Sequence, residues 1–461
     1  MTTPRTRRRL ARAAAVLAAT AVAGAAMPAA EAKPPKGDTA RVSETAKGEP
    51  LNGPSWALGL SDDGRSALFR SAATNLLPGP GTPNTDEVYV RNLRNGHLER
   101  VSVAADGSRL NAPTSDASIS GDGRYVAFST TATNVVPGQP AHGSDVFVRD
   151  RWTGRTELVS AAALPGTDDQ SLAEAVRPSI SGNGRYVAYA SNRTDLAPGI
   201  DTRGRDNIYV TDRWTHTSRL VTVGATGTAA DRDSLNPVIS ADGSTIAFTS
   251  KARNLLPADP DPADGGSVPE APGLAGGPRF YPTYAWKAAT GTIVGASLNE
   301  AGQLDASNYG RISPDGRYAV YSLPTDAAGM PGHGGARFDL YVHELATGKV
   351  TPVNPEVSGK EPKGHTTGGV MTADSRWVYF ESGIDFLVPG DTNGFQDVFR
   401  RDLWTGRIER INLTRDGGQS DTPAGDPFVD ASGDTVIFGS DDGNLVPGIT
   451  NDFHDVFLRR L

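Results

Sequence analysis

One segment of the chain is repeated seven times, and this repetition limits the possible folds more than any other feature of the sequence. The clearest copy extends from Ser118 to Ser160. It begins with a turn of the type S-x-D-G and continues through an apolar run, a loop that contains Val-Pro-Gly, and a second apolar run. A Trp-Thr-Gly turn and a last short run complete the copy. Short apolar runs bounded by Gly, Pro and Asp predict β-strands.

The seven copies follow one another at nearly constant spacing. Aligned on the last position of the S-x-D-G turn, they are separated by 59, 61, 59, 73, 59 and 58 residues. The apolar run after each turn is nearly continuous rather than alternating, which suits a strand buried on both faces. The aligned positions are Gly64, Gly123, Gly184, Gly243, Gly316, Ser375 and Gly433.

Each copy predicts four short strands, a to d, with tight a–b and c–d turns. Four antiparallel strands at this period predict an all-β fold, a seven-bladed β-propeller with four-stranded antiparallel blades. The seventh copy ends at Leu461 before its strand d. Thr39–Ser43 resembles strand d of the other copies, for example Leu98–Ser102. We therefore expect this N-terminal strand to pair with Asp455–Arg459 and to close the last blade, which leaves no free sheet edge.

The turn and the strand after it also resemble a known family. Ser313-Pro314-Asp315-Gly316-Arg317-Tyr318 is similar to the repeat of the TolB-like propellers, which are related to WD-repeat propellers. The resemblance covers about Thr39 to Leu461 and implies the fold. It implies little about function, because members include periplasmic scaffolds, enzyme-attached propellers and lyases. TolB itself looks like a six-bladed propeller behind a separate N-terminal domain, so the seventh repeat is a difference.

Residues 1–32 have the composition of an export signal. A basic segment with five arginines precedes an alanine-rich stretch, and Ala30-Glu31-Ala32 has the form of a cleavage site. The stretch is too short and too weakly apolar for a membrane span. The N-terminal arginines also resemble a twin-arginine signal, so the general secretory and twin-arginine routes both stay open. We expect a secreted protein, extracellular or in the cell envelope, with residues 33–38 as a linker and residues 39–461 as the propeller.

The charge of the chain restricts the class of partner. Removal of residues 1–32 takes away five arginines and one glutamate, and the formal charge then changes from −8 to −12. An acidic surface argues against nucleic acid, whose phosphates require basic side chains. The chain has no cysteine, so neither disulfides nor thiolate metal sites can form. We expect a monomer that is held together by burial of its core.

Chain direction places the two kinds of connection on opposite faces of the predicted ring. We call the face of the a–b and c–d turns the tight-turn face, and the face of the b–c and d–a connections the long-loop face. Variable loops over a rigid scaffold commonly bind ligands, so we expect a site on the long-loop face. A Pro/Gly-rich insertion at residues 257–282 of blade 4 is either a flap over the channel mouth or a flexible surface segment. The predicted binding residues form an acidic rim of Asp168, Asp169, Asp231 and Asp233.

Residues that recur from copy to copy are interpreted as scaffold, because seven equivalent copies cannot all be one site. Tryptophan recurs in the c–d turn, and we expect it to be a packing residue rather than an aromatic platform for a ligand. Aspartate recurs at the start of strand c, and we expect its carboxylate to cap the turn. These residues are Trp152, Trp214 and Trp404, and Asp145, Asp339, Asp397 and Asp455.

One segment has the oxygen donors of a calcium loop. Asp391, Asn393 and Asp397 alternate around Gly394, and carboxylate and amide oxygens are ligands that calcium prefers. The alternative is an ordinary loop with an Asx turn. No cofactor other than this calcium ion is expected. Four histidines fall on the long-loop face but in different blades, so we do not expect them to converge on one metal: His142, His333, His365 and His454.

The sequence favours a binding protein over an enzyme. It lacks a G-x-S-x-G nucleophile motif. We therefore predict a secreted, non-catalytic binding or scaffolding propeller that engages a protein or a cell-envelope polymer through the long-loop face. The alternative is a carbohydrate-active enzyme, a polysaccharide lyase or hydrolase, with its site at the channel mouth.

Overall fold

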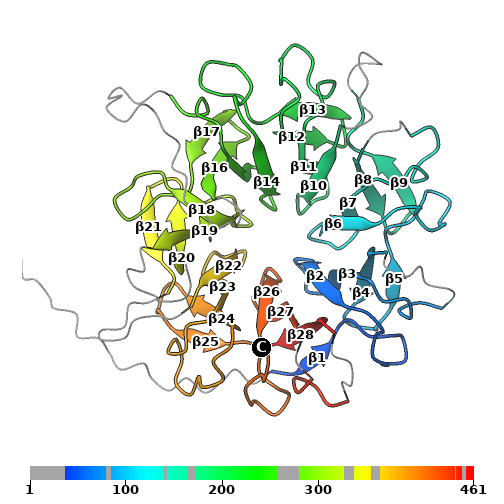
Figure 1. The fold of residues 1–461 in the computed structure, drawn as a ribbon, viewed down its shortest axis with the longest axis vertical. Helices are drawn as coiled ribbons and strands as arrows, with labels where there is room; N and C mark the ends of the chain where they lie inside the picture. Colours follow the sequence, from blue (N-terminus) through cyan, green and yellow to red (C-terminus); the bar gives the residue numbers. More distant parts are fainter. Residues whose placement is uncertain are drawn as a thin grey trace, which may run out of the picture. The chain divides into compact units, whose positions relative to one another are not determined.

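The computed structural model describes residues 37–78, 85–139, 143–162, 173–257, 280–325, 337–354, 364–441, 443–448 and 453–461. Their regular elements are β-strands, β1 to β28. Within the unit Pro34–Leu461, seven antiparallel four-stranded blades surround a central axis (Figure 1). We number these blades 1 to 7 along the chain. The seven-bladed all-β propeller predicted from the repeats is confirmed.

Each blade consists of four consecutive strands, except the last. Blade 1 contains β2 (Ser55–Leu60), β3 (Ser66–Ser71), β4 (Glu87–Asn92) and β5 (Leu98–Arg100). Blade 2 contains β6 (Thr114–Ile119), β7 (Tyr125–Thr130), β8 (Asp145–Asp150) and β9 (Arg155–Leu158). Blade 3 contains β10 (Ala175–Ile180), β11 (Tyr186–Ser191), β12 (Asn207–Asp212) and β13 (Thr217–Leu220).

Blades 4 and 5 are joined into one sheet by a short pairing between β16 and β18. Blade 4 contains β14 (Ser234–Ile239), β15 (Thr245–Ser250), β16 (Tyr281–Lys287) and β17 (Thr292–Gly295). Blade 5 contains β18 (Ala306–Ile312), β19 (Tyr318–Thr325), β20 (Arg337–Glu344) and β21 (Lys349–Pro352). Blade 6 contains β22 (Thr366–Met371), β23 (Trp377–Ser382), β24 (Asp397–Asp402) and β25 (Ile408–Arg410).

The last blade is completed from the N-terminus, as predicted. Blade 7 contains β26 (Ala424–Val429), β27 (Thr435–Ser440) and β28 (Asp455–Arg460), and β1 (Thr39–Arg41) is its outer strand. β1 is antiparallel to β28, with Thr39 opposite Arg459 and Arg41 opposite Phe457. In Figure 1 the blue β1 therefore lies beside the red β28.

Most of the core lies between neighbouring blades. Val148 of blade 2, for example, belongs to the same buried cluster as Val187 and Tyr189 of blade 3. Each blade also contains one stacked aromatic pair between its second and third strands, with ring centroids 5.7 to 6.3 Å apart. Since most core clusters draw their residues from two blades, the blades depend on one another for burial.

The aspartates at the start of the third strand tie this strand to the fourth. The Asp145 carboxylate is buried and accepts a 2.7 Å hydrogen bond from the Ser160 hydroxyl, just beyond β9. Asp397 accepts one of 2.6 Å from Asn412 in the same way. In blade 7 the donor is Ser43, which follows β1, and its bond to Asp455 is 2.7 Å long. These carboxylates are scaffold, as expected, but they bridge two strands instead of capping a turn.

The expectation that tryptophan packs in the c–d turns is wrong. Trp152, Trp214 and Trp404 are 68%, 64% and 73% exposed. The apolar surface of neighbouring blades is already covered by residues of the strands, so the turn residues lie outside the core. These rings therefore remain available to solvent on the tight-turn face.

The closure of blade 7 predicts how the chain responds to shortening at its N-terminus. Deletion of residues 33–46 from the chain that begins at Lys33 should lower the melting temperature by roughly 5 °C, because β28 loses its outer strand and Asp455 its hydrogen-bond donor. Differential scanning calorimetry measures the change. Deletion of residues 33–36 alone keeps β1 and is the control. An unchanged melting temperature after the longer deletion would contradict the role given to β1.

Candidate functional site

A cavity along the axis of the ring is the main candidate site in the described part of the chain. Its volume is about 1110 Å³, and residues of the innermost strand of every blade line it. Its wall near the tight-turn face is apolar, with Leu60, Ile119, Ile180, Ile312, Met371 and Val429. Closer to the long-loop face it carries polar and charged side chains, among them Asp116, Arg177, Asn236, Lys251, Asn308 and Arg311.

The polar part of the wall coincides with an irregularity in the innermost strands. Each of these seven strands shifts its register against the next strand, as at a β-bulge. Three residues with side chains occupy the left-handed backbone region there, namely Arg177 with φ 55°, Asn236 with φ 54° and Asp426 with φ 51°. Such a conformation costs on the order of 1–2 kcal/mol, and residues that retain it are concentrated at functional sites.

The cations of the wall have partners around the cavity. The Arg177 guanidinium donates a hydrogen bond to the Asn236 side-chain oxygen in the next blade. The Lys251 ammonium lies 3.0 Å from an Asp233 carboxylate oxygen. The Arg311 guanidinium lies 5.4 Å from the centre of the Phe428 ring. The wall thus presents charged groups of both signs next to apolar surface, an arrangement that suits a polar ligand with apolar faces.

A buried carboxyl group supports the wall between blades 6 and 7. Glu381 on β23 accepts hydrogen bonds from the Thr367 hydroxyl, at 2.7 Å, and from the Asp426 backbone N–H, at 2.9 Å. Burial raises the pKa of Glu381, and the charge of Asp426 acts in the same direction. The carboxyl therefore holds the bulge of blade 7, and its elevated pKa makes it a candidate proton donor.

Sequence reasoning missed the wall residues Asp116, Arg177 and Asn236, although their shared position in the repeat gives a signal for them. The position seven places before the aligned turn residue differs in nearly every copy, while the buried positions around it repeat. It is occupied by Ala57, Asp116, Arg177, Asn236, Tyr309, Gly368 and Asp426.

The structure describes only half of the predicted acidic rim. Asp168 and Asp169 lie outside the described residues, as do residues 258–279 of the predicted insertion. Asp231 is exposed and accepts a 2.8 Å hydrogen bond from the Arg253 backbone N–H. Asp233 forms the ion pair with Lys251 at the cavity wall. The pKa of nearby Asp206 is raised by burial and by the charge of Asp233.

The described histidines do not meet at one point. His454 stacks on Trp56 at 6.4 Å and lies 2.6 Å from an Asp441 carboxylate oxygen. His365 instead lies against the Phe338 ring in another part of the ring of blades. His142 and His333 are outside the described residues. In the described ranges, no group of three or more acidic or histidine side chains is placed to hold a metal ion.

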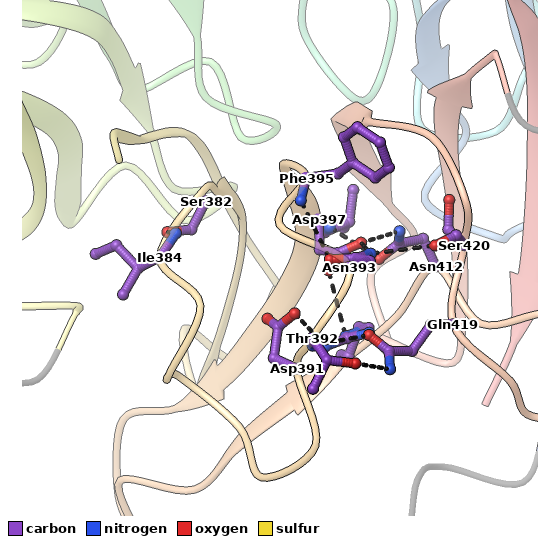
Figure 2. Close-up of polar contacts among 12 residues, drawn as sticks. Ser382, Ile384, Asp391, Thr392, Asn393, Phe395, Asp397, Asn412, Gln419 and Ser420 are labelled. Carbon is purple, nitrogen blue, oxygen red and sulfur yellow. Dashed lines mark hydrogen bonds and ion pairs between the residues drawn. The ribbon is translucent and has the colours of Figure 1, made fainter. Parts of the chain in front are cut away.

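The predicted calcium residues surround an internal cation. One Asp391 carboxylate oxygen lies 2.8 Å from the Arg410 guanidinium, and an Asp397 oxygen lies 3.4 Å from it. Asn393 turns its amide N–H₂ toward Asp397, at 3.2 Å, while its oxygen accepts a 3.2 Å bond from the Phe395 N–H (Figure 2). The latter bond is an Asx turn, the alternative weighed from the sequence.

These contacts define what calcium would require at this loop. Burial raises the pKa of Asp391 to about 6, even though Arg410 acts in the opposite direction. A calcium ion would have to displace the guanidinium, rotate the Asn393 amide and keep Asp391 ionised. Calcium binding here stays a prediction, and the residues as arranged fit an ion pair better than a calcium loop.

The fold matches solved β-propellers. An oligogalacturonate lyase from Vibrio parahaemolyticus has a TM-score of 0.52 and 12% identity over 92% of this chain and 93% of the lyase. The propeller domain of the Trilobed protease from Pyrococcus furiosus has a TM-score of 0.48 and 12% identity over 88% of this chain and 95% of that one. TolB from Acinetobacter baumannii has a TM-score of 0.35 and 14% identity over 82% and 77%.

The chain is a β-propeller. At these identities the likeness extends to the fold alone, so the narrower TolB-like relationship stays a resemblance. No protein-family model matches the chain, and no curated protein matches it in sequence. Within the described ranges, no helix has the length and apolar character of a membrane span.

The arrangement around Arg410 predicts how calcium and this side chain compete. Arg410→Met should lower the melting temperature, because two buried carboxylates lose their cation, a change that typically costs about 3–5 kcal/mol. Millimolar calcium should then recover more of the melting temperature in the variant than it adds to the wild type. Thermal unfolding with calcium or with a chelator measures both effects. Arg94→Met, at an exposed arginine, is the control. No calcium effect on either protein would make the calcium interpretation wrong.

Proposed function

We propose that this propeller is a secreted binding module that receives its partner at the long-loop mouth of the axial cavity. The observation that carries the proposal is the diversity of one structural layer. At equivalent positions in the bulge of the innermost strands, different blades have an aspartate, an arginine, an asparagine or a glycine. If this position served only the fold, the same residue type would recur there in every blade, as it does in the buried layers.

The strain at this layer supports the same proposal. Arg177, Asn236 and Asp426 hold a backbone conformation that glycine adopts at far lower cost, and blade 6 does have glycine there, Gly368. Side chains kept at such positions contribute something that glycine cannot. Arg177 and Asn236 line the axial cavity, and Asp426 lies in the equivalent bulge of blade 7, so the simplest common purpose is contact with a bound molecule.

The partner that we propose is a protein or a cell-envelope polymer. The export signal expected in residues 1–32 would bring the chain to such partners. The acidic rim, with Asp231 and Asp233 and with Asp168 and Asp169 from the sequence, would attract a basic partner over a distance set by ionic screening.

A carbohydrate-active enzyme is the second candidate. It is favoured by Glu381, because burial shifts the pKa of this carboxyl upward, the direction that a general acid requires. The lyase with the same fold acts on oligogalacturonate, which makes this compound a suitable first substrate to test. Degradation of oligogalacturonate by the wild type, abolished by Glu381→Gln, would favour this second candidate.

The binding proposal predicts that reversal of one charge at the wall weakens binding. Arg177→Glu should reduce co-sedimentation with purified cell-wall sacculi, or recovery of cross-linked envelope proteins, by about tenfold. The variant places a carboxylate where a cation with a fixed position stood. Quantitative mass spectrometry of both fractions measures the loss.

Arg94→Glu is the matched control, since it makes the same change of charge at an exposed residue of the tight-turn face. Melting temperatures should agree among the three proteins. Equal losses in the two variants would mean that charge acts only globally, and unchanged recovery with Arg177→Glu would contradict a site in the cavity.

A further inference from the structure

Two neighbouring blades carry a row of aromatic rings and guanidinium groups on the tight-turn face, with an exposed tryptophan at each end. Arg124 lies 4.7 Å from the ring centre of Trp152 and 4.7 Å from that of Tyr125. Arg213 of the next blade lies 4.3 Å from the Tyr125 ring and directly precedes Trp214. Successive contacts thus connect one exposed tryptophan to the other. We call this the Trp152–Trp214 strip.

Each tryptophan of the strip is held in place on one side only. The Arg124 guanidinium covers one face of Trp152 and is fixed by two hydrogen bonds, of 3.0 and 2.7 Å, to Asp150. Arg185 holds Trp214 in the same way, 4.6 Å from its ring and 3.0 and 2.6 Å from Asp212. With 68% and 64% of their surfaces exposed, both rings leave the other face open to solvent.

Ligand binding to the strip should cost little conformational entropy, because its side chains are already held in place. The backbone N–H groups of Trp152 and Trp214 each donate a 3.0 Å hydrogen bond to the same aspartate that fixes the arginine. Turn, guanidinium and ring are therefore ordered before anything binds, and pre-ordered groups lose less freedom on association. A core function does not explain these rings, since the blade interface beneath them is filled by Tyr125, which packs on Gly184.

The chemistry of the strip indicates a carbohydrate. Flat, electron-rich ring faces attract the slightly positive C–H groups of a pyranose, while the charged groups at their edges can bind its hydroxyls. In β-1,4-linked chains of glucose or N-acetylglucosamine the hydroxyls point sideways, so both ring faces present only C–H groups. Two open tryptophans in consecutive blades also match a ligand that repeats along its length, because linked contacts reinforce one another.

We propose that the Trp152–Trp214 strip binds a β-1,4-linked polysaccharide. The strip lies on the face opposite the long-loop mouth, so this proposal is independent of the partner in the axial cavity. It gives the protein a second surface by which it attaches to a polymer of the cell exterior.

Affinity gel electrophoresis tests the proposal with hydroxyethylcellulose and glycol chitin as the β-1,4-linked probes and glycogen as the α-linked probe. The wild type should be retarded by the first two polymers and not by glycogen. Trp152→Ala and Trp214→Ala should each weaken binding about fivefold to tenfold, and the double variant should abolish it. Both rings are exposed, so circular dichroism and the melting temperature should not change.

Trp404→Ala is the matched control. Trp404 in blade 6 has the same turn, the same stacked arginine at 4.9 Å and 73% exposure, but the corresponding position of blade 5 is Ala346. Its variant should bind like the wild type. The proposal is overturned if neither β-1,4-linked polymer retards the wild type, as expected of a strip that docks a protein, or if the Trp404 variant loses as much binding as the other two.

Discussion

A buried hydrogen bond between the third strand of a blade and the residue beyond its fourth strand supports the rest of this structure. The carboxylate of Asp145, Asp339, Asp397 or Asp455 cannot be buried at low cost unless a donor meets it, and Ser160, Asn354, Asn412 and Ser43 provide that donor at 2.6 to 2.7 Å. In blade 3 an amide replaces the acid, and Thr222 donates to Asn207 at 2.7 Å. In these five blades the bond fixes the outer half of the blade, so that its inner half can pack on the next blade.

The same bond explains why the two ends of the chain meet. Blade 7 has its acid, Asp455, but the donor comes from Ser43, more than four hundred residues away in sequence. Because one core cluster joins blades 7 and 1, an open gap between them would expose apolar surface on both sides. The ring is thus closed by the same strand-to-strand hydrogen bond that occurs within the other blades.

The features that could be predicted from the sequence are those that recur in several copies of the repeat. The blade number, the tight turns and the pairing of β1 follow from spacing, because each is a copy of something seen several times. The exposure of Trp152 could not be predicted, since a recurrent tryptophan has the same sequence pattern whether it packs or stacks under an arginine. The candidate calcium loop reads correctly as a cluster of oxygen donors. The ion pairs of Arg410 with Asp391 and Asp397 join neighbouring parts of blade 6, and the spacing of these residues in the sequence does not reveal them.

The scaffold leaves two layers free to vary, and both proposals use them. Inside the ring, the bulge of the innermost strands varies from blade to blade while the strands around it keep their packing. On the rim, the c–d turns vary because they lie beyond the core, and only blades 2, 3 and 6 carry tryptophan there. Positions that differ among the blades are therefore the candidates for function, and positions that recur in them are the candidates for stability.

Native-state hydrogen exchange at the Val456 amide tests the closure most directly. This N–H donates a 2.8 Å hydrogen bond to the Ser43 hydroxyl, and the equivalent N–H of Val146 donates one of 3.0 Å to Ser160 within a continuous blade. If closure makes blade 7 equal to the others, the protection of the two amides should agree within about tenfold. Exchange of Val456 roughly a thousandfold faster than that of Val146 would show that blade 7 opens on its own, and would contradict the account.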